Sequence, residues 1–201
     1  MPQLALQQLP CVLLLSVLGL TSACQSLPVP PALLSAAGVS AEPDSALTYR
    51  SERLGLSFSY PQELTIEEKG STIKVWATED YRAVREGRYA GGTELPPHLA
   101  ISTYPNPQHL PLRKWLQGSG NEYFGLLKED VREMLLSNRP TLFFSSDALY
   151  SQKNVLFASR QGDRIAAISK AELEARGGDA AKSQTYQRAF EQIIASFSPD
   201  S

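Results

Sequence analysis

The chain has 201 residues, with 19 basic and 21 acidic side chains and a formal net charge of −2. Hydrophobic residues make up 42% of it and charged residues 20%, a globular composition that excludes a wholly disordered, collagen-like or coiled-coil protein. Nucleic-acid binding depends on a strongly basic surface, so this near-neutral charge predicts no nucleic-acid partner.

The N-terminal segment is predicted to be a targeting signal rather than part of the fold. Residues 1–23 carry no Asp, Glu, Lys or Arg, and Cys11 to Leu20 form an apolar run of ten residues. A membrane-spanning helix needs about 20 apolar residues, so this short run is typical of the hydrophobic region of a secretory signal. The usual basic residue ahead of that region is missing, which leaves open whether Met1 is the true start.

The sequence TSAC, Thr21 to Cys24, resembles the lipobox of bacterial lipoproteins. In that family the Cys follows small residues, is acylated on its sulfur and becomes the first residue of the mature chain. Thr21 stands where Leu is usual, with Leu20 one position early. The resemblance implies a palmitate-type anchor at Cys24 in the cell envelope, on the extracytoplasmic side of a bacterial membrane. The alternatives are a plain signal cleaved after Ala23, which leaves a free thiol, and a retained N-terminal anchor.

Residues 24–46 are predicted to be the lipidated Cys followed by a flexible tether. This segment contains four Pro and many Ala and Ser, and its only charges are Glu42 and Asp44. Its Pro-Val-Pro-Pro sequence also fits a polyproline ligand, although a linker is preferred. Once the signal is removed, Cys24 is the only Cys, so neither an intrachain disulfide nor a Cys-based zinc site is expected.

Residues 47–199 are predicted to form one domain with seven strands. Each strand is indicated by period-2 alternation or by a short apolar run between turn residues. The predicted strands are Leu56–Tyr60, Leu64–Glu67, Ile73–Trp76, Leu99–Thr103, Thr141–Ser146, Asn154–Ser159 and Arg164–Lys170. The first three are expected to form a meander, and residues 79–97 a long polar loop with at most one helical turn.

Two helices are predicted in the same domain. Pro111 suits a first helical position, and Leu112 to Leu116 place apolar residues on one face, with Gly118-Ser119-Gly120 expected to end the helix. Residues 121–136 fit either a helix or a strand. A second amphipathic helix is predicted from Tyr186 to Phe197, stopped by Pro199. Two groups of strands, separated and followed by helices, indicate an α+β fold with a mostly antiparallel sheet.

Four segments resemble PsbP-like domains and related bacterial lipoproteins. They are the strand Leu56–Pro61, the segment Asn138–Phe144, the strand pair from Val155 to Ile168, and the C-terminal Phe190–Phe197. Together they extend over about residues 48–198. The resemblance implies the α/β/α sandwich of the PsbP/DcrB-like superfamily. Its best-known members are extrinsic subunits or assembly factors of photosystem II, others are envelope lipoproteins or eukaryotic adaptors, and no catalytic residues come with the family.

The sequence carries little that indicates catalysis. His98 and His109 are expected to be separate surface imidazoles; the alternative is that they meet a carboxylate and bind a metal. No Gly-x-Ser-x-Gly sequence occurs, and the neighbouring Glu67 and Glu68 are expected to point apart on a strand. We therefore predict no catalytic residue, no metal site, no cofactor and no enzyme activity.

One segment is a candidate for binding a partner. Three arginines spaced by three residues stand between two tyrosines, and these residue types are favoured in interfaces. The candidate residues are Tyr81, Arg82, Arg85, Arg88 and Tyr89. The alternative is a solvated loop whose arginines pair locally with Glu79, Asp80 and Glu86.

The sequence thus predicts an exported, lipid-anchored, non-enzymatic domain that binds or supports a membrane-associated protein complex. The alternatives are a periplasmic lipoprotein that binds a small ligand or metal, and, third, a hydrolase. Trp76 and Trp115 are expected to be buried, and the Pro-rich loop Tyr104–His109 to be rigid enough to frame a groove. A deep apolar pocket near His98 or His109 would favour ligand binding, and a flat Tyr/Arg surface would favour docking.

Overall fold

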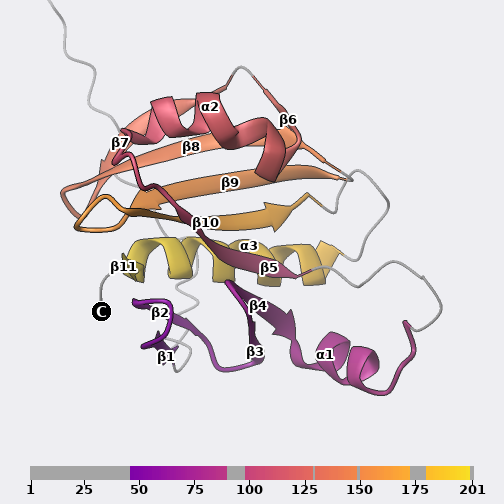
Figure 1. The fold of residues 1–201 in the computed structure, drawn as a ribbon. Helices are drawn as coiled ribbons and strands as arrows, with labels where there is room; N and C mark the ends of the chain where they lie inside the picture. Colours follow the sequence, from indigo (N-terminus) through magenta and orange to yellow (C-terminus); the bar gives the residue numbers. More distant parts are fainter. Residues whose placement is uncertain (1–45, 90–97, 129, 149, 173–179, 200–201) are drawn as a thin grey trace, which may run out of the picture. The chain divides into compact units, whose positions relative to one another are not determined.

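The computed structural model describes residues 46–89, 98–128, 130–148, 150–172 and 180–199, and two antiparallel sheets form the frame of this part of the chain (Figure 1). The large sheet has eight strands in the order β3-β4-β5-β10-β9-β8-β6, with β7 also paired to β8. Its strands are β3 (Leu64–Lys69), β4 (Thr72–Ala77), β5 (Leu99–Pro105), β6 (Leu126–Leu127), β7 (Arg132–Leu136), β8 (Arg139–Asp147), β9 (Ser151–Ala158) and β10 (Arg164–Ala171). The small sheet consists of β1 (Ala46–Ser51), β2 (Leu56–Pro61) and β11 (Ser198–Pro199), in the order β1-β2-β11.

The predicted turns join neighbouring strands of the large sheet. A two-residue turn connects β3 to β4, and Gly70 adopts a φ of 55° there, which glycine allows without strain. Between β9 and β10, Gly162 has a φ of 74°, and the Ser159 N–H donates to the Arg164 carbonyl at 2.9 Å. These turns set the register in which apolar side chains alternate between the two faces of the sheet.

Helices cover both faces of the large sheet, as Figure 1 shows. Helix α2 (Leu112–Phe124) packs Trp115, Leu116 and Phe124 on one face, against a cluster that includes Leu142 and Leu156. Helix α3 (Ala180–Ser196) packs on the other face, within a larger cluster that also contains side chains of the small sheet. The predicted α+β architecture, an α/β/α sandwich around a mostly antiparallel sheet, is confirmed.

The predicted meander of the first three strands is wrong. Strand β2 pairs with β1 and β11 and not with β3, so the first strand group is divided between the two sheets. Strand β11 contains Pro199, which was expected only to stop the last helix. One of the two partners of β2, strand β11, therefore comes from the far end of the chain, and Ser57 lies opposite Ser198.

Two predicted helix boundaries also need correction. The predicted polar loop at residues 79–97 begins instead with helix α1 (Thr78–Arg85), and residues 90–97 lie outside the described part of the chain. Helix α1 has acidic residues in its first turn and arginines in its last, an order that suits the helix dipole. Helix α2 continues through Gly118 and Gly120 and ends at Phe124, followed by Gly125 with a φ of 74°. The ambiguous residues 121–136 therefore contain the end of a helix followed by the strands β6 and β7.

Both tryptophans are buried, as predicted. The Trp76 side chain is 1% exposed, and its ring lies 4.3 Å from the His98 ring. Trp115 is 3% exposed, and its indole N–H donates to the Pro105 carbonyl at 3.3 Å. None of the helices in the described part of the chain is long and apolar enough to cross a bilayer.

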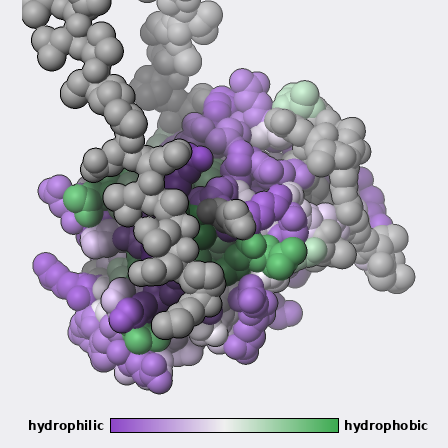
Figure 2. Space-filling model, turned by 90° about the horizontal axis from the view of Figure 1, so that it is seen from above, coloured by the Kyte–Doolittle hydropathy of each residue, from purple (hydrophilic) through white to green (hydrophobic). Residues whose placement is uncertain are grey.

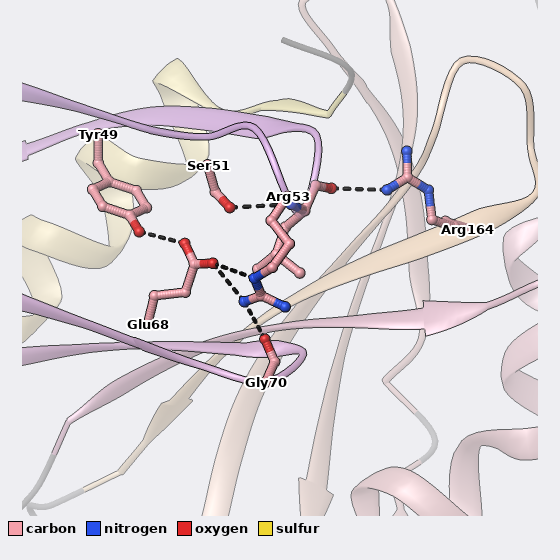
Figure 3. A network of polar contacts seen from close by, with 7 residues as sticks. Tyr49, Ser51, Arg53, Glu68, Gly70 and Arg164 are labelled. Carbon is pink, nitrogen blue, oxygen red and sulfur yellow. Dashed lines mark hydrogen bonds and ion pairs between the residues drawn. The ribbon is translucent and has the colours of Figure 1, made fainter.

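A polar network around Glu68 joins the small sheet to β3 (Figure 3). The Tyr49 hydroxyl donates to one carboxylate oxygen of Glu68, and the Arg53 guanidinium donates to the other through Nε at 2.9 Å. Burial alone would raise the pKa of Glu68, but hydrogen bonds from Tyr49, Ser51 and Arg53 outweigh it and lower that pKa below its ordinary 4.5. Burial and the bond to Glu68 raise the pKa of Tyr49 to about 12.

Replacing Glu68 by Gln is expected to destabilise the fold at pH 7 by about 1–2 kcal/mol, since charge-assisted hydrogen bonds are lost. A carboxyl whose pKa is depressed in the folded state stabilises it at pH values above the unfolded pKa, near 4.5, and this contribution is lost as pH falls through the folded-state pKa. Urea unfolding of the two proteins from pH 7 to pH 3 should therefore show a difference that shrinks on acidification. A difference independent of pH would mean that the Glu68 charge does not hold the two sheets together.

Candidate functional site

A groove with a volume of about 590 Å³ lies between the start of α2 and the edge strand β7. We call it the β7 groove. Its lining is mostly apolar and comes from the loop before α2, from β7 and from the ends of β8 and β9. It is lined by His109, Leu110, Pro111, Leu112, Arg113, Glu133, Met134, Leu135, Pro140, Thr141, Ala158 and Gly162.

Asn106 holds the loop that forms one wall of the β7 groove. Its side chain is 1% exposed, and its amide nitrogen donates to the carbonyls of Leu110 at 3.0 Å and Gly162 at 2.7 Å. Its amide oxygen accepts the Leu110 N–H at 3.0 Å. The loop therefore makes the hydrogen bonds that a buried asparagine requires, and His109, at the end of the segment Tyr104–His109, lines the groove.

His109 has an unusual backbone in this wall. Its φ is 51°, a left-handed conformation that is uncommon outside glycine, and its Nδ1 lies 2.9 Å from the Gln161 carbonyl oxygen. Backbone strain of this kind persists only where surrounding contacts impose it, and it concentrates at functional sites. The imidazole is thus fixed against the β9–β10 turn, and its side chain borders the groove.

Pro140 explains why the floor of the groove is open. The ladder between β8 and β9 extends from Asp147 only to Thr141, so it stops just before Pro140. Proline has no N–H to donate, and a continued ladder would have placed it opposite Ala158. Pro140, which is exposed, and the half-buried Ala158 therefore line the groove beside the start of α2.

Strand β7 forms the other wall and exposes large apolar side chains. Leu135 is 68% exposed and Met134 48% exposed, whereas the core residues of the neighbouring strands are almost fully buried. Glu133 accepts a hydrogen bond from Arg113 Nε at 2.6 Å, which ties β7 to the start of α2. Seen from above, hydrophobic patches lie among hydrophilic side chains on the surface of the molecule (Figure 2).

A second hollow of about 460 Å³ adjoins the β7 groove and shares Pro140 and Ala158 with it. Its other lining residues are mainly polar or basic: Asn138, Arg139, Ser159, Arg160 and Pro199. The two hollows together bend around the ends of β8 and β9. An occupant would meet apolar surface in the first hollow and arginine side chains in the second.

The groups nearest His109 are not arranged for nucleophilic catalysis. The Ser159 hydroxyl donates to Asp163 at 2.7 Å and accepts the Arg164 N–H at 3.2 Å, so it completes the β9–β10 turn. Its hydrogen bond lowers the pKa of the Asp163 carboxyl below the ordinary value. A serine nucleophile needs a base within hydrogen-bond reach, and this hydroxyl is committed to a carboxylate and a backbone N–H.

The predicted arginine segment lies on and just after α1, far from the β7 groove in sequence. Arg82, Arg85 and Arg88 are exposed, while Tyr81 and Tyr89 are half-buried. Arg88 forms a salt bridge with Glu86 at 2.7 Å, as the local-pairing alternative expected. That this segment binds a partner stays a prediction.

Asp80, by contrast, does not pair with these arginines. It is 6% exposed and accepts a hydrogen bond from Lys182 Nζ at 2.9 Å, and Tyr186 Oη lies 3.4 Å from its other oxygen. The same tyrosine oxygen accepts the Ala77 N–H at 2.7 Å. Asp80 therefore fastens α1 to α3, which leaves the cations of Arg82 and Arg85 on the exposed side of α1.

The histidines and paired carboxylates do not gather into a site. His98 stacks on Trp76, and His109 contacts Gln161. Glu67 lies 3.3 Å from the Trp76 indole nitrogen, whereas Glu68 faces Tyr49, so the two carboxylates point apart as expected. Within the described residues, no three His, Cys, Asp or Glu side chains are grouped so that they could hold a metal ion. Glu129 and Cys24 lie outside the described residues.

The sequence analysis missed most of the β7 groove. The loop at His109 was expected to frame a groove, but the contribution of β7 was not, because residues 121–136 fitted either a helix or a strand. The sequence feature that could have indicated an exposed apolar edge is Met134-Leu135-Leu136, a run of apolar residues in a short strand. A strand buried on one face alternates, so a run of this kind on an edge indicates that both faces are apolar.

No family model matches the chain, and no curated protein matches it in sequence. Among solved structures, it is similar to the solution structure of cyanobacterial PsbP (CyanoP) from Synechocystis sp. PCC 6803, with a TM-score of 0.46 and 12% identity over 82% of this chain and 97% of that chain. It is also similar to the Saccharomyces cerevisiae Ran-binding protein Mog1p, with a TM-score of 0.46 and 10% identity over 77% of this chain and 95% of that chain.

Proposed function

We propose that this protein is an exported lipoprotein, anchored through Cys24, whose folded domain is not an enzyme and binds a partner protein of a membrane-associated complex. The binding surface is the β7 groove with the adjoining edge of β7. The observation that carries this is the exposure of Leu135 and Met134 beside an apolar groove of about 590 Å³. The anchor is supported by the TSAC sequence and the export by the apolar run before it.

Exposed apolar side chains on an edge strand are costly unless a partner covers them. Each fully buried leucine or methionine side chain contributes about 1.5–3 kcal/mol relative to its exposed state. Apolar surface grouped beside a groove marks interaction sites in soluble domains, and uncovered edge strands invite aggregation. A domain that retains such a surface is therefore suited to a partner that covers it.

Small-ligand binding is the second candidate, and the groove near His109 favours it. Ligand pockets have volumes of about 300–1,000 Å³, and the β7 groove lies within that range. A ligand site also needs a few polar groups that converge on the occupant. Here Nδ1 of His109 is engaged by Gln161, and Glu133 is engaged by Arg113. Protein docking needs no such convergence, so it ranks first.

A photo-crosslinking amino acid at position 134 tests the site in native membranes. We expect a defined protein adduct at Met134, and its loss when Leu135 is also replaced by Asp. The same crosslinker at Arg82 reports on α1, and an Arg82/Arg85/Arg88→Ala variant is the matched comparison. An adduct only at Arg82 would move the docking surface to α1. No protein adduct at either position, together with a small molecule that copurifies, would replace protein docking by ligand binding.

A further inference from the structure

We infer that the partner contributes an extended segment that pairs with the outer edge of β7 and adds a strand to the large sheet, with apolar side chains at alternate positions and carboxylates near both ends. This rests on the proposed function, because it states how the partner binds and which chemistry it carries. In this arrangement the partner segment is bound by backbone hydrogen bonds along β7 and by contacts with the groove beside that strand.

Within the part of the chain that the structure describes, the backbone of β7 pairs on one side only. Ser137 and Asn138 have φ values of 49° and 62°, the left-handed pair that makes a two-residue hairpin turn, and Leu136 lies opposite Arg139. In such a hairpin the closing pair exchanges both backbone hydrogen bonds, and bonded pairs alternate from there. Glu133 and Leu135 therefore direct their N–H and C=O groups away from β8. Among the described strands, β7 pairs with β8 alone.

The two edges of the large sheet are built differently. At the other edge, β3 carries Glu67, Glu68 and Lys69, and Glu68 is held by Tyr49 and Arg53 from the region of the small sheet. Charges and covering contacts of this kind are how proteins protect an edge strand. Strand β7 has neither protection at Met134 and Leu135, so the unprotected edge coincides with the groove.

Charge selects an acidic occupant. Arg132 opens β7 and Arg139 opens β8; both are exposed, and neither forms a salt bridge within the described residues. Of the four charged residues that line the two hollows, three are arginines, and the one acid, Glu133, pairs with Arg113. This surface is basic on a chain whose net charge is −2. A strand with carboxylates at its ends would complement both arginines.

The groove sets the side chains of the added strand. Leu135 lies opposite Pro140, and side chains opposite each other in an antiparallel pair share a face. That face is the one covered by α2, because Leu142 and Phe144, which alternate with Pro140 along β8, pack in the α2 cluster. Every second side chain of an added strand would therefore point over the β7 groove, and apolar residues suit its lining.

Full-length protein in mild detergent, titrated with a fluorescent seven-residue peptide, tests this directly. The probe is an N-acetylated, C-terminally amidated peptide with Val alternating with Thr and Asp at both ends. The comparison peptides have the same residues scrambled, or Lys at both ends. We expect the Asp-ended peptide to bind about tenfold more tightly than the Lys-ended peptide at low salt, and this ratio to shrink at 0.5 M NaCl. Equal binding of all three peptides would overturn the inference.

Two substitutions at one position separate backbone pairing from apolar contact. Leu135→Pro removes an outward N–H and leaves the bonds to β8 in place, so we expect binding to weaken about tenfold or more. Leu135→Thr keeps the N–H and loses only apolar surface, and we expect a weakening of about threefold. If both variants weaken binding equally, the side chain alone is responsible and strand addition is wrong.

Hydrogen exchange of the unmodified protein tests backbone pairing along β7 without any substitution. On peptide binding, the amides of Glu133 and Leu135 should become at least about tenfold more protected, while that of Met134 should change little. No change at Glu133 and Leu135 in a peptide-saturated sample would exclude strand addition even if the crosslink at position 134 had confirmed a protein partner. Self-association that Leu135→Pro abolishes would identify the occupant as a second copy and overturn the acidic partner strand.

Discussion

Replacing Asn106 by Ala is expected to lower the free energy of unfolding by about 2–4 kcal/mol and to disorganise the wall of the β7 groove. The side chain is buried and makes three hydrogen bonds to backbone groups, two at Leu110 and one at Gly162. Alanine would leave two carbonyl groups and one N–H without these partners. The left-handed conformation at His109 would lose part of its support, because the Asn106 side chain fixes the next residue, Leu110, through two of these hydrogen bonds.

Urea unfolding measures the loss, and Asn154→Ala is the matched control. Asn154 is also 1% exposed, but its partners are hydroxyl groups: it donates to Ser146 Oγ and accepts from Ser169 Oγ, and a hydroxyl can rotate toward another partner. We expect a smaller loss of stability for Asn154→Ala and no change in peptide binding at β7. Asn106→Asp should be at least as damaging as Asn106→Ala, because a carboxylate would face two carbonyl oxygens. A stable Asn106→Ala variant with intact binding would show that the loop does not depend on this side chain.

Local pattern predicted the strands of this domain because strand alternation and turn residues act over short stretches of sequence. The strand at Ile73–Trp76 and the β9–β10 hairpin were expected from alternation and from the Gly162 turn, and the structure has both. The burial of Trp76, on the face opposite to Val75, was preferred over its exposure for binding because a sandwich has helices on both faces of its sheet, and the structure buries it. These features need no knowledge of distant residues.

Pairing between distant segments was not predictable in the same way. Nothing near Ser57 indicates that Ser198 lies opposite it. Likewise the spacing of Arg82 and Arg85 predicted a shared side of a helical turn, but only the structure shows that Asp80 turns inward to Lys182. Contacts of this kind depend on how whole helices and strands pack together. The residue pattern of a single sequence therefore does not predict which distant residues meet.

Some parts of the β7 groove follow from local sequence patterns, and others depend on pairing between distant segments. The loop at His109 and the arginine at position 139 belong to patterns seen in the sequence, but the floor of the groove lies where the β8–β9 ladder stops before Pro140. A proline in a central strand is a local signal for such an interruption. Its consequence, an open apolar floor beside an exposed edge, depends on the order of strands in the sheet. The spacing of the arginines was visible in the sequence, so the predicted binding residues lie on and just after α1, and their role stays a prediction. The edge of β7, by contrast, was not predicted as a candidate surface from the sequence.

Replacing Cys24 by Ala is expected to move nearly all of the protein from the membrane fraction to the soluble fraction. Each buried CH₂ of an acyl chain contributes about 0.8 kcal/mol to membrane binding, so a multiply acylated cysteine is a strong anchor and its loss has a correspondingly large effect. Fractionation of cells followed by intact-mass measurement tests this. Cys11→Ala is the matched control: Cys11 lies inside the apolar run, and its replacement should leave the anchor unchanged.

The mass of the product separates the remaining possibilities. An acylated chain that begins at Cys24 should carry the added mass of its acyl groups, and Cys24→Ala should abolish that addition. A Cys24→Ala variant that stays on the membrane and retains residues 1–23 would show that the uncleaved N-terminal segment is the anchor. A wild-type chain that begins at Cys24 with a free thiol would instead show plain secretion. In either case the β7 surface would still be tested separately by the crosslink at Met134, because docking of the folded domain does not depend on the means of attachment.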